Sequence, residues 1–300
     1  MKEKILIAML IAIGAITEFF PNVSAQDAAA KAQELIAKAR VALGGEKLKS
    51  LQSLSAEGNY RRNLGGIEMS GELVIEMALP DKMLKAETMR PFGDLEINHL
   101  EAINGDNVWE DQQQSGGGSG MIVIRRGGSN TDPHRAQEMM KNGIRADFAR
   151  LSLGMLLTTA PSFPVQYSYA GEAESPDGKA DVLDVKGANN FYVRLFLDQK
   201  THRPLMITYK GKKPRVIQQT SADGPPPEHE LDKQIKESEA EAAKSPDVEF
   251  QVRFAEYKDV SGISLPHRIF KGIENDTNEE IEFTKYKINP QLKPEKFVKK

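Results

Sequence analysis

The segment from Ile67 to Leu79 alternates between two kinds of residue over its whole length. Every second residue is apolar or glycine (Ile, Met, Gly, Leu, Ile, Met, Leu), and three of the intervening residues are glutamates. Such alternation predicts a β-strand with one apolar face and one solvated face. At ~3.3 Å per residue the strand spans roughly 43 Å, about twice the length of a common strand. It therefore predicts a large, curved antiparallel sheet whose concave apolar face must be filled.

The N-terminus has the pattern of an export signal. Lys2 and Lys4 precede an apolar run from Ile5 to Ile16, and the segment ends in Val23-Ser24-Ala25. The run is shorter than the roughly 20 residues of a membrane span. We expect a signal peptide over residues 1–25, a mature chain that begins at Gln26, and a periplasmic location.

The composition restricts the partners and the covalent chemistry. The chain has no cysteine, which rules out disulfides and a lipid-modified cysteine anchor. Its net charge is −3, with both signs interspersed, so we expect no nucleic-acid partner. After the signal no apolar run reaches the length of a membrane helix, so we expect no stable insertion of the mature chain.

The period-two pattern recurs along the chain and predicts an α+β fold. Expected strands fall in three groups: 53–63, 67–79, 82–89, 94–103 and 108–113; then 165–174, 180–187, 191–198 and 205–210; then 250–257, 263–273 and 279–288. Helices are expected over 27–43, capped by Asp27, and from Pro133 onward, with a break or bend at Gly143. Residues 26–300 are expected to form one domain, an incomplete, strongly curved antiparallel β-barrel wrapped around helices.

Two segments depart from the pattern. Residues 112–131 form a Gly-rich loop with an apolar patch, Met121–Ile124, which is either a lid over a cavity or an insertion with one short strand. Residues 212–247 are highly charged and poor in large apolar residues, so we expect a disordered insertion or a solvated helix there.

The sequence shows no catalytic signature. The five histidines lie far apart, and there is no nucleophile elbow, phosphate-binding loop or dinucleotide fingerprint. We expect no enzyme activity, no metal and no cofactor; a catalytic carboxylate pair formed only in three dimensions is the alternative. Exported amphipathic strands rich in methionine favour a binding protein for an apolar ligand.

The candidate ligand groove takes the apolar residues of the central strands and of the middle helix. They are Met69, Leu73, Ile75, Met77, Trp109, Ile122, Phe148, Leu151, Met155, Val193 and Leu195. The alternative is that these residues fill a solid core, as apolar residues at strand and helix spacing commonly do.

Three groups of motifs resemble the LolA/LolB-like family of periplasmic lipoprotein carriers. The first runs from Gly71–Ile75 through Leu79-Pro80-Asp81-Lys82 to Asn104–Trp109, the second is Leu197–Pro204, and the third is Ile288–Phe297. The resemblance implies an incomplete barrel whose groove carries an acylated lipoprotein or a lipid across the periplasm to the outer membrane. It also implies inner- and outer-membrane transport partners. A non-enzymatic binding or sensor module, with a protein segment or another envelope component in the same groove, remains the alternative.

Overall fold

The computed structural model describes residues 24–64, 66–90, 95–116, 120–125, 133–175, 178–213, 215–220, 233, 237, 244–274 and 276–299. For residues 64, 67, 120–125, 133 and 215–220 it describes the backbone alone. The expected signal peptide up to residue 23, and large parts of the segments 112–131 and 212–247, lie outside this set. Among the helices that the structure does describe, none is long and apolar enough to cross a membrane.

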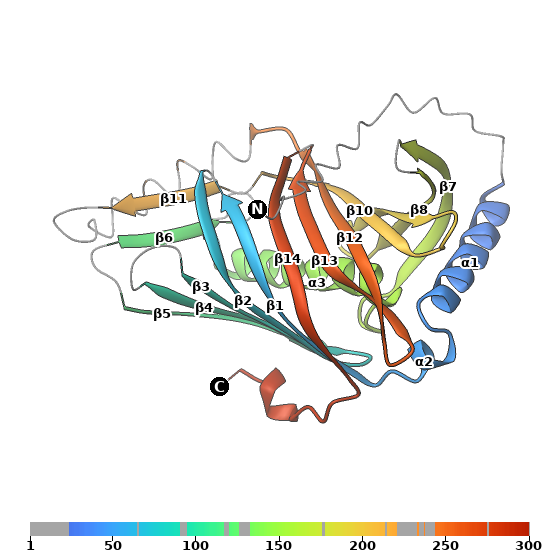
Figure 1. The fold of residues 1–300 in the computed structure, drawn as a ribbon. Helices are drawn as coiled ribbons and strands as arrows, with labels where there is room; N and C mark the ends of the chain where they lie inside the picture. The colour runs from blue at the N-terminus through green and yellow to red at the C-terminus, as the bar shows by residue number, and fades with distance from the viewer. Residues whose placement is uncertain are drawn as a thin grey trace, which may run out of the picture.

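Twelve strands form one antiparallel sheet, which confirms the expected fold class. They are β1 (Ser53–Leu64), β2 (Ile67–Ala78), β3 (Lys82–Arg90), β4 (Glu96–Asn104), β5 (Asn107–Ser115), β7 (Val165–Ser175), β8 (Gly178–Gly187), β9 (Tyr192–Asp198), β10 (Pro204–Gly211), β12 (Val248–Val260), β13 (Ile263–Ile273) and β14 (Asp276–Ile288). Their order is β5-β4-β3-β2-β1-β14-β13-β12-β10-β9-β8-β7. The first strand pairs with the last, so two meanders are joined into one strongly curved, open sheet (Figure 1).

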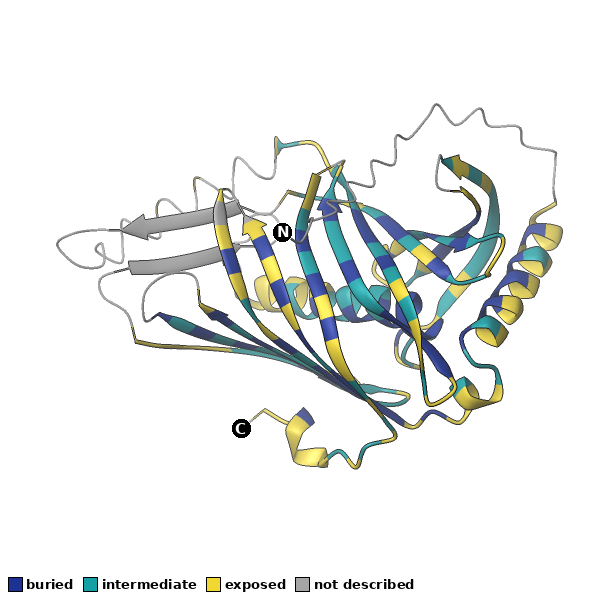
Figure 2. Cartoon of the chain, in the orientation of Figure 1, coloured by how far each residue is buried: buried dark blue, intermediate teal, exposed yellow. Residues whose placement is uncertain are grey.

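The register places the apolar positions of neighbouring strands in rows on one face. One row crosses five strands and consists of Leu54, Met77, Met83, Ile103 and Val108, all of them buried. Buried and exposed residues alternate along β1, β2 and β14, as expected for a sheet with one covered face (Figure 2). The hydroxyl of Ser152, on the long helix described below, lies 3.4 Å from the sulfur of Met83. That contact identifies the face with Met83 as the inner, concave face.

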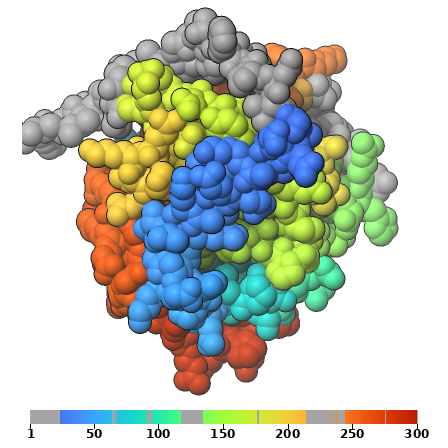
Figure 3. Space-filling view, turned by 90° about the vertical axis from the view of Figure 1, so that its right-hand side faces the viewer, coloured from blue at the N-terminus to red at the C-terminus, as the bar shows by residue number. Residues whose placement is uncertain are grey.

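Helix α1 (Ala25–Ala42) packs against β7, and a short helix α2 (Glu46–Lys49) follows it. Figure 3 looks onto this side of the molecule, where α1 lies across the surface. The helix begins two residues before the expected start, because Ser24, not Asp27, is its N-cap. The Oγ atom of Ser24 accepts a hydrogen bond from the backbone N–H of Asp27, 3.2 Å away, which satisfies one of the free amides of the first turn.

Helix α3 (Pro133–Leu156) runs inside the curve of the sheet and contacts β4, β5 and β10 (Figure 1). The expected break at Gly143 is wrong, since that glycine lies within one uninterrupted helix. The C-terminal half of the helix is the buried half, and it ends close to α1, where Arg40 donates to the carbonyl oxygen of Leu157 at 3.0 Å.

The two irregular segments meet in a second sheet. Strand β6 (Gly120–Arg125) contains the apolar patch of the Gly-rich segment, and β11 (Arg215–Thr220) lies at the start of the charged one. They pair antiparallel, with Ile124 opposite Val216. This two-stranded sheet is separate from the twelve-stranded one (Figure 1).

Candidate functional site

The structure brings most of the candidate groove residues together on the concave face. Seven of them belong to one cluster of buried apolar side chains: Leu73, Ile75, Met77, Phe148, Met155, Val193 and Leu195. Leu151 packs against the edge of that cluster, and Met69 is buried on the same face of β2. The α3 residues among them fill the space that the sheet encloses.

Trp109 does not join this group. The strand register places it in a row with Ala102, Leu84 and Glu76, on the convex face of the sheet. There its indole N–H donates to the carbonyl oxygen of Phe297, 3.0 Å away, in the C-terminal 3₁₀ helix η1 (Pro294–Phe297). The side chain of the last candidate, Ile122, lies outside the described residues.

A row of charged side chains interrupts the apolar concave face. We call it the inner charged band; it consists of Arg62, Lys85, Glu87, His99, Glu101, Glu110, Lys271 and Glu279. These residues come from β1, β3, β4, β5, β13 and β14. Strand periodicity explains how they reach this face: Lys85 and Glu87 alternate in step with Met83 and Met89, and His99 and Glu101 in step with Ile97 and Ile103.

Arg62 is the centre of the band. Its Nη2 atom lies 3.0 Å from Oε1 of Glu87, and its Nε atom donates to Oε2 of Glu279. All three side chains are less than a tenth exposed. Lys271 adds a second cation, with its Nζ atom 2.6 Å from Oε1 of Glu279. A buried charge is expensive to desolvate unless it is paired, and each of these carboxylates has a cation in contact.

The pairs determine the protonation of the band. Burial by itself would raise the pKa of Glu279, but Arg62 and Lys271 together lower it to about 2. Burial acts in the same direction on Glu87, and the charges of Lys85 and Arg62 hold its pKa well below the usual range. Both groups are therefore carboxylates at neutral pH.

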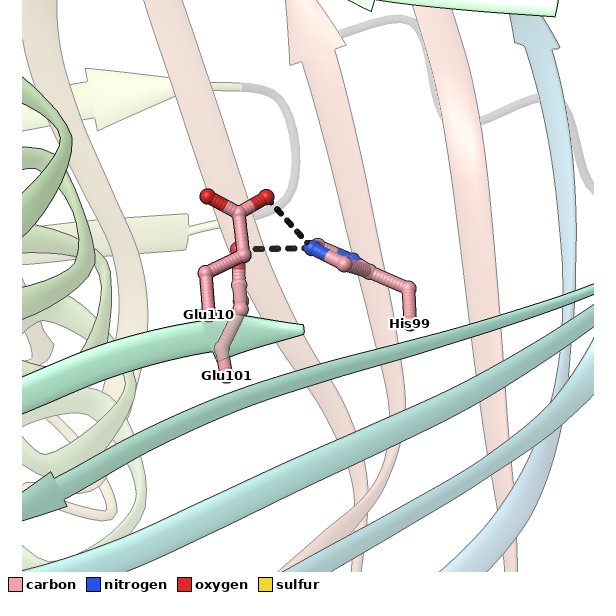
Figure 4. Close-up of side chains that lie close together, drawn as sticks. All are labelled: His99, Glu101 and Glu110. Atoms are coloured by element: carbon pink, nitrogen blue, oxygen red, sulfur yellow. Dashed lines mark hydrogen bonds and ion pairs between the residues drawn. The ribbon is translucent and has the colours of Figure 1, made fainter. Parts of the chain in front are cut away.

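His99 lies at the β4–β5 end of the band. Burial would lower the pKa of its imidazole, but the hydrogen bond to Glu110 and the nearby carboxylates of Glu87 and Glu101 raise it to about 9. Its Nε2 atom is 2.7 Å from Oε1 of Glu110 and 3.9 Å from Oε1 of Glu101 (Figure 4). An imidazole with two carboxylates around one nitrogen can hold a proton or a cation there.

The sequence interpretation missed this band, although a signal for it was present. It assigned Glu68, Glu72 and Glu76 to the solvated face of a strand, which holds for Glu68 and Glu72. The assignment is wrong for Glu76, which is buried and paired with Lys296 at 2.7 Å. The signal lay in β3 and β4, where the charged residues occupy the same alternate positions as the Met and Ile residues and therefore share their face of the sheet. The ion pairs of Arg62 with Glu87 and Glu279 could not be predicted in this way, because the paired residues lie 25 and 217 positions apart in the sequence.

No protein-family model matches the sequence, and no curated protein matches it either. Solved structures similar to the chain include a LolA superfamily protein from Nitrosomonas europaea, which is 11% identical with a TM-score of 0.44; the match covers 89% of this chain and 97% of that one. An outer membrane lipoprotein-sorting protein domain from Vibrio parahaemolyticus, described as putative, is 11% identical with a TM-score of 0.48, over 90% and 97% of the two chains. A DUF1329 family protein from Desulfovibrio piger is 10% identical with a TM-score of 0.45, over 89% and 97%.

Proposed function

We propose that the protein is an exported, non-enzymatic carrier. It binds the acyl chain of a lipoprotein or a lipid on the concave face of the sheet and transfers it across the periplasm to the outer membrane. The observation that carries the proposal is that this apolar face packs against a helix, α3, which a ligand of similar apolar area can replace. The N-terminal signal pattern and the sequence motifs that resemble lipoprotein carriers support the same function.

The burial free energies of α3 and of an acyl chain on the concave face are comparable. Five large apolar side chains of α3 are buried, namely Ile144, Phe148, Leu153, Met155 and Leu156. At about 1.5–3 kcal/mol for each fully buried side chain, they contribute roughly 8–15 kcal/mol. An acyl chain of ~16 carbons gains at most about 12 kcal/mol, at ~0.8 kcal/mol per methylene. An acyl chain can therefore displace the helix and can be displaced by it, so that both binding and release are possible, as a carrier requires.

The ionisable groups of the concave face favour binding over catalysis. The carboxylates of Glu87 and Glu279 are each held between two cations. Ion pairs of this kind hold their members in place, whereas a general base must accept a proton near neutral pH. This arrangement suits a rigid wall of a binding site.

The contact between α3 and the sheet offers a way to test displacement of the helix. A Cβ atom added at Gly154 would lie 1.8 Å from Cζ of Phe254, a buried residue of β12. Gly143, on the same helix, is exposed, and an added Cβ there would meet no atom within 4 Å. Gly154→Ala therefore requires α3 or the Phe254 ring to move, and Gly143→Ala is its matched control.

The experiment is displacement of a fluorescent fatty acid from the wild type and both variants. Overpacking costs about 1–3 kcal/mol, and a shift of that size changes the open population about 5- to 150-fold. Because apparent affinity follows the population of the open state, we expect tighter binding by Gly154→Ala together with a lower Tm. Gly143→Ala is expected to bind like the wild type, and circular dichroism controls for folding.

Native mass spectrometry of the protein purified from the envelope fraction supplies the second readout. A bound lipid or acyl chain supports the carrier. A folded wild type and a folded Gly154→Ala variant that both bind no acyl chain in either assay would overturn the proposal. Recovery of a protein segment in place of a lipid would assign the concave face to the binding or sensor module instead.

A further inference from the structure

Three side chains at the β4–β5 end of the inner charged band converge on one point (Figure 4). His99 and Glu101 are two residues apart on β4 and so project from the same face. Glu110 lies directly opposite Glu101 in the β4–β5 ladder. Each residue offers one ligand atom, and the three atoms all lie within 4.8 Å of one another. The atom of His99 that faces both carboxylates is Nε2. Backbone hydrogen bonds between adjacent strands hold the three residues in this arrangement.

The opposite side of the imidazole supplies an independent observation. The Nδ1 atom of His99 faces Oε2 of Glu87 at 3.8 Å. That oxygen is buried, and within the described residues it has no hydrogen-bond partner. The other oxygen of Glu87 is held by Arg62 and Lys85, at 3.0 and 2.9 Å. A buried carboxylate behind one ring nitrogen, with the other nitrogen among candidate ligands, is the usual surrounding of a metal-bound histidine.

We propose that His99, Glu101 and Glu110 bind a divalent transition-metal ion, with Glu87 orienting the imidazole of His99 from behind. One imidazole and two carboxylates form a mixed nitrogen and oxygen ligand set, which suits zinc better than magnesium or calcium, since those ions prefer oxygen ligands alone. The ion would be a second feature of the concave face, separate from the apolar part that we assign to the acyl chain.

The distances fit a tetrahedral ion after small movements. Zinc bonds of ~2.0–2.1 Å to nitrogen and oxygen place two tetrahedral ligand atoms ~3.3 Å apart. The two separations from His99 Nε2, 2.7 Å to Glu110 and 3.9 Å to Glu101, lie on either side of that value. Each of these two separations differs from the tetrahedral value by about half an ångström.

The site also has access for the ion and for a fourth ligand. The side chain of Glu110 is 37% exposed, whereas those of Glu101 and His99 are 5% and 10% exposed. An ion that enters past Glu110 would meet the two buried ligands and keep its outer position for water. Three protein ligands and one open position are typical of sites where zinc exchanges a water for another ligand.

The test uses the mature protein, stripped of metal by a chelator and titrated with zinc chloride in an isothermal titration calorimeter. Metal analysis after desalting counts the bound ions. The ligand variants are Glu110→Gln and His99→Gln. The matched control is Asp111→Asn, which makes the same change of charge at a half-buried neighbour of Glu110 on the opposite face of β5. Circular dichroism confirms that each variant is folded.

We expect one zinc ion per chain for the wild type and for Asp111→Asn, and affinity at least tenfold weaker for both ligand variants. We also expect zinc to raise the Tm of the wild type and not that of Glu110→Gln, because an ion that binds the folded state alone stabilises it. A wild type that binds no zinc would overturn the proposal. So would zinc binding that survives in both ligand variants, since the ion would then lie elsewhere. Neither outcome depends on the acyl-chain assays.

Discussion

The Nη2 atom of Arg62 lies 3.0 Å from Oε1 of Glu87, although the two residues belong to β1 and β3 and strand β2 runs between them. Arg62 lies opposite Met69 and Glu87 opposite Leu73, and Gly71, between those two β2 residues, carries no side chain on the concave face. A Cβ atom there would lie 1.9 Å from the carbonyl oxygen of Thr88 and 3.0 Å from the hydroxyl of Tyr60. The Arg62–Glu87 pair thus spans β2 at a position where that strand has no side chain.

Loss of Arg62 should be strongly destabilising. Arg62→Met removes the cation and leaves the carboxylates of Glu87 and Glu279 buried, which typically costs about 3–5 kcal/mol. Urea denaturation measures the loss. The matched control is Arg61→Gln, one position away: Arg61 is 68% exposed and pairs with Glu280 at 3.0 Å, so the expected change is at most about 1 kcal/mol. Equal effects of the two substitutions would show that the band contributes no more than a surface pair.

Acid should destabilise the fold through Glu279. Its pKa is about 2 in the folded protein and ~4.5 when unfolded. A group with a lowered folded pKa stabilises the fold above its unfolded pKa, and that contribution disappears as the pH falls from ~4.5 toward ~2. The groups that face Glu279 are Arg62, Lys271 and Glu87.

Glu279→Gln is therefore expected to flatten the dependence of the unfolding free energy on pH between ~4.5 and ~2. Urea denaturation at a series of pH values measures that slope. Glu282→Gln, at an exposed position of the same strand, serves as the control and should leave the slope as in the wild type. Identical slopes for the wild type and Glu279→Gln would contradict the assignment.

Trp109 should report on the C-terminus and not on the ligand. It is the single tryptophan of the chain, and its indole N–H is bonded to the carbonyl oxygen of Phe297, a residue that is 1% exposed. Phe297→Ala is expected to cost about 3–5 kcal/mol and to shift tryptophan emission to longer wavelength, as water reaches the indole. Val298→Ala, at a residue that is 53% exposed, is the control. Emission that responds to an acyl ligand and is unchanged by Phe297→Ala would place the indole in the groove after all.

Export should remove the first 25 residues. Intact mass of protein from the envelope fraction is expected to correspond to a chain that begins at Gln26, because Ala25 is the small residue that a signal peptidase reads. Replacing Ala25 with a bulky leucine should block the cleavage. The processed chain also lacks Ser24, so the first turn of α1 loses its side-chain cap. A cytoplasmic product that retains Met1–Ala25 would refute the prediction.

The sequence by itself determined the strands and the faces they present. Period-two alternation is a local property, so the apolar face of β2, with Leu73, Ile75 and Met77, can be identified from that segment alone. Short connections between consecutive strands then require antiparallel meanders. The face of α3 that carries Phe148 and Met155 follows in the same way from helical spacing. These local rules were enough to predict the fold class and to place most of the candidate groove residues on one apolar face.

Only the tertiary structure decided what those faces meet. Strand alternation shows that Glu87 shares a face with Met83. The contact of Glu87 with Arg62, however, depends on the order of the strands in the sheet. The contact of Arg62 with Glu279 depends on the pairing of the first strand with the last. Trp109 was assigned to the groove because its side chain is apolar. The strand register instead places it in the same row as Glu76, on the convex face. The side chains of His99, Glu101 and Glu110 come together for the same reason. A charge in a strand is solvated or buried according to which distant segment packs over it, and the local sequence carries no record of that segment.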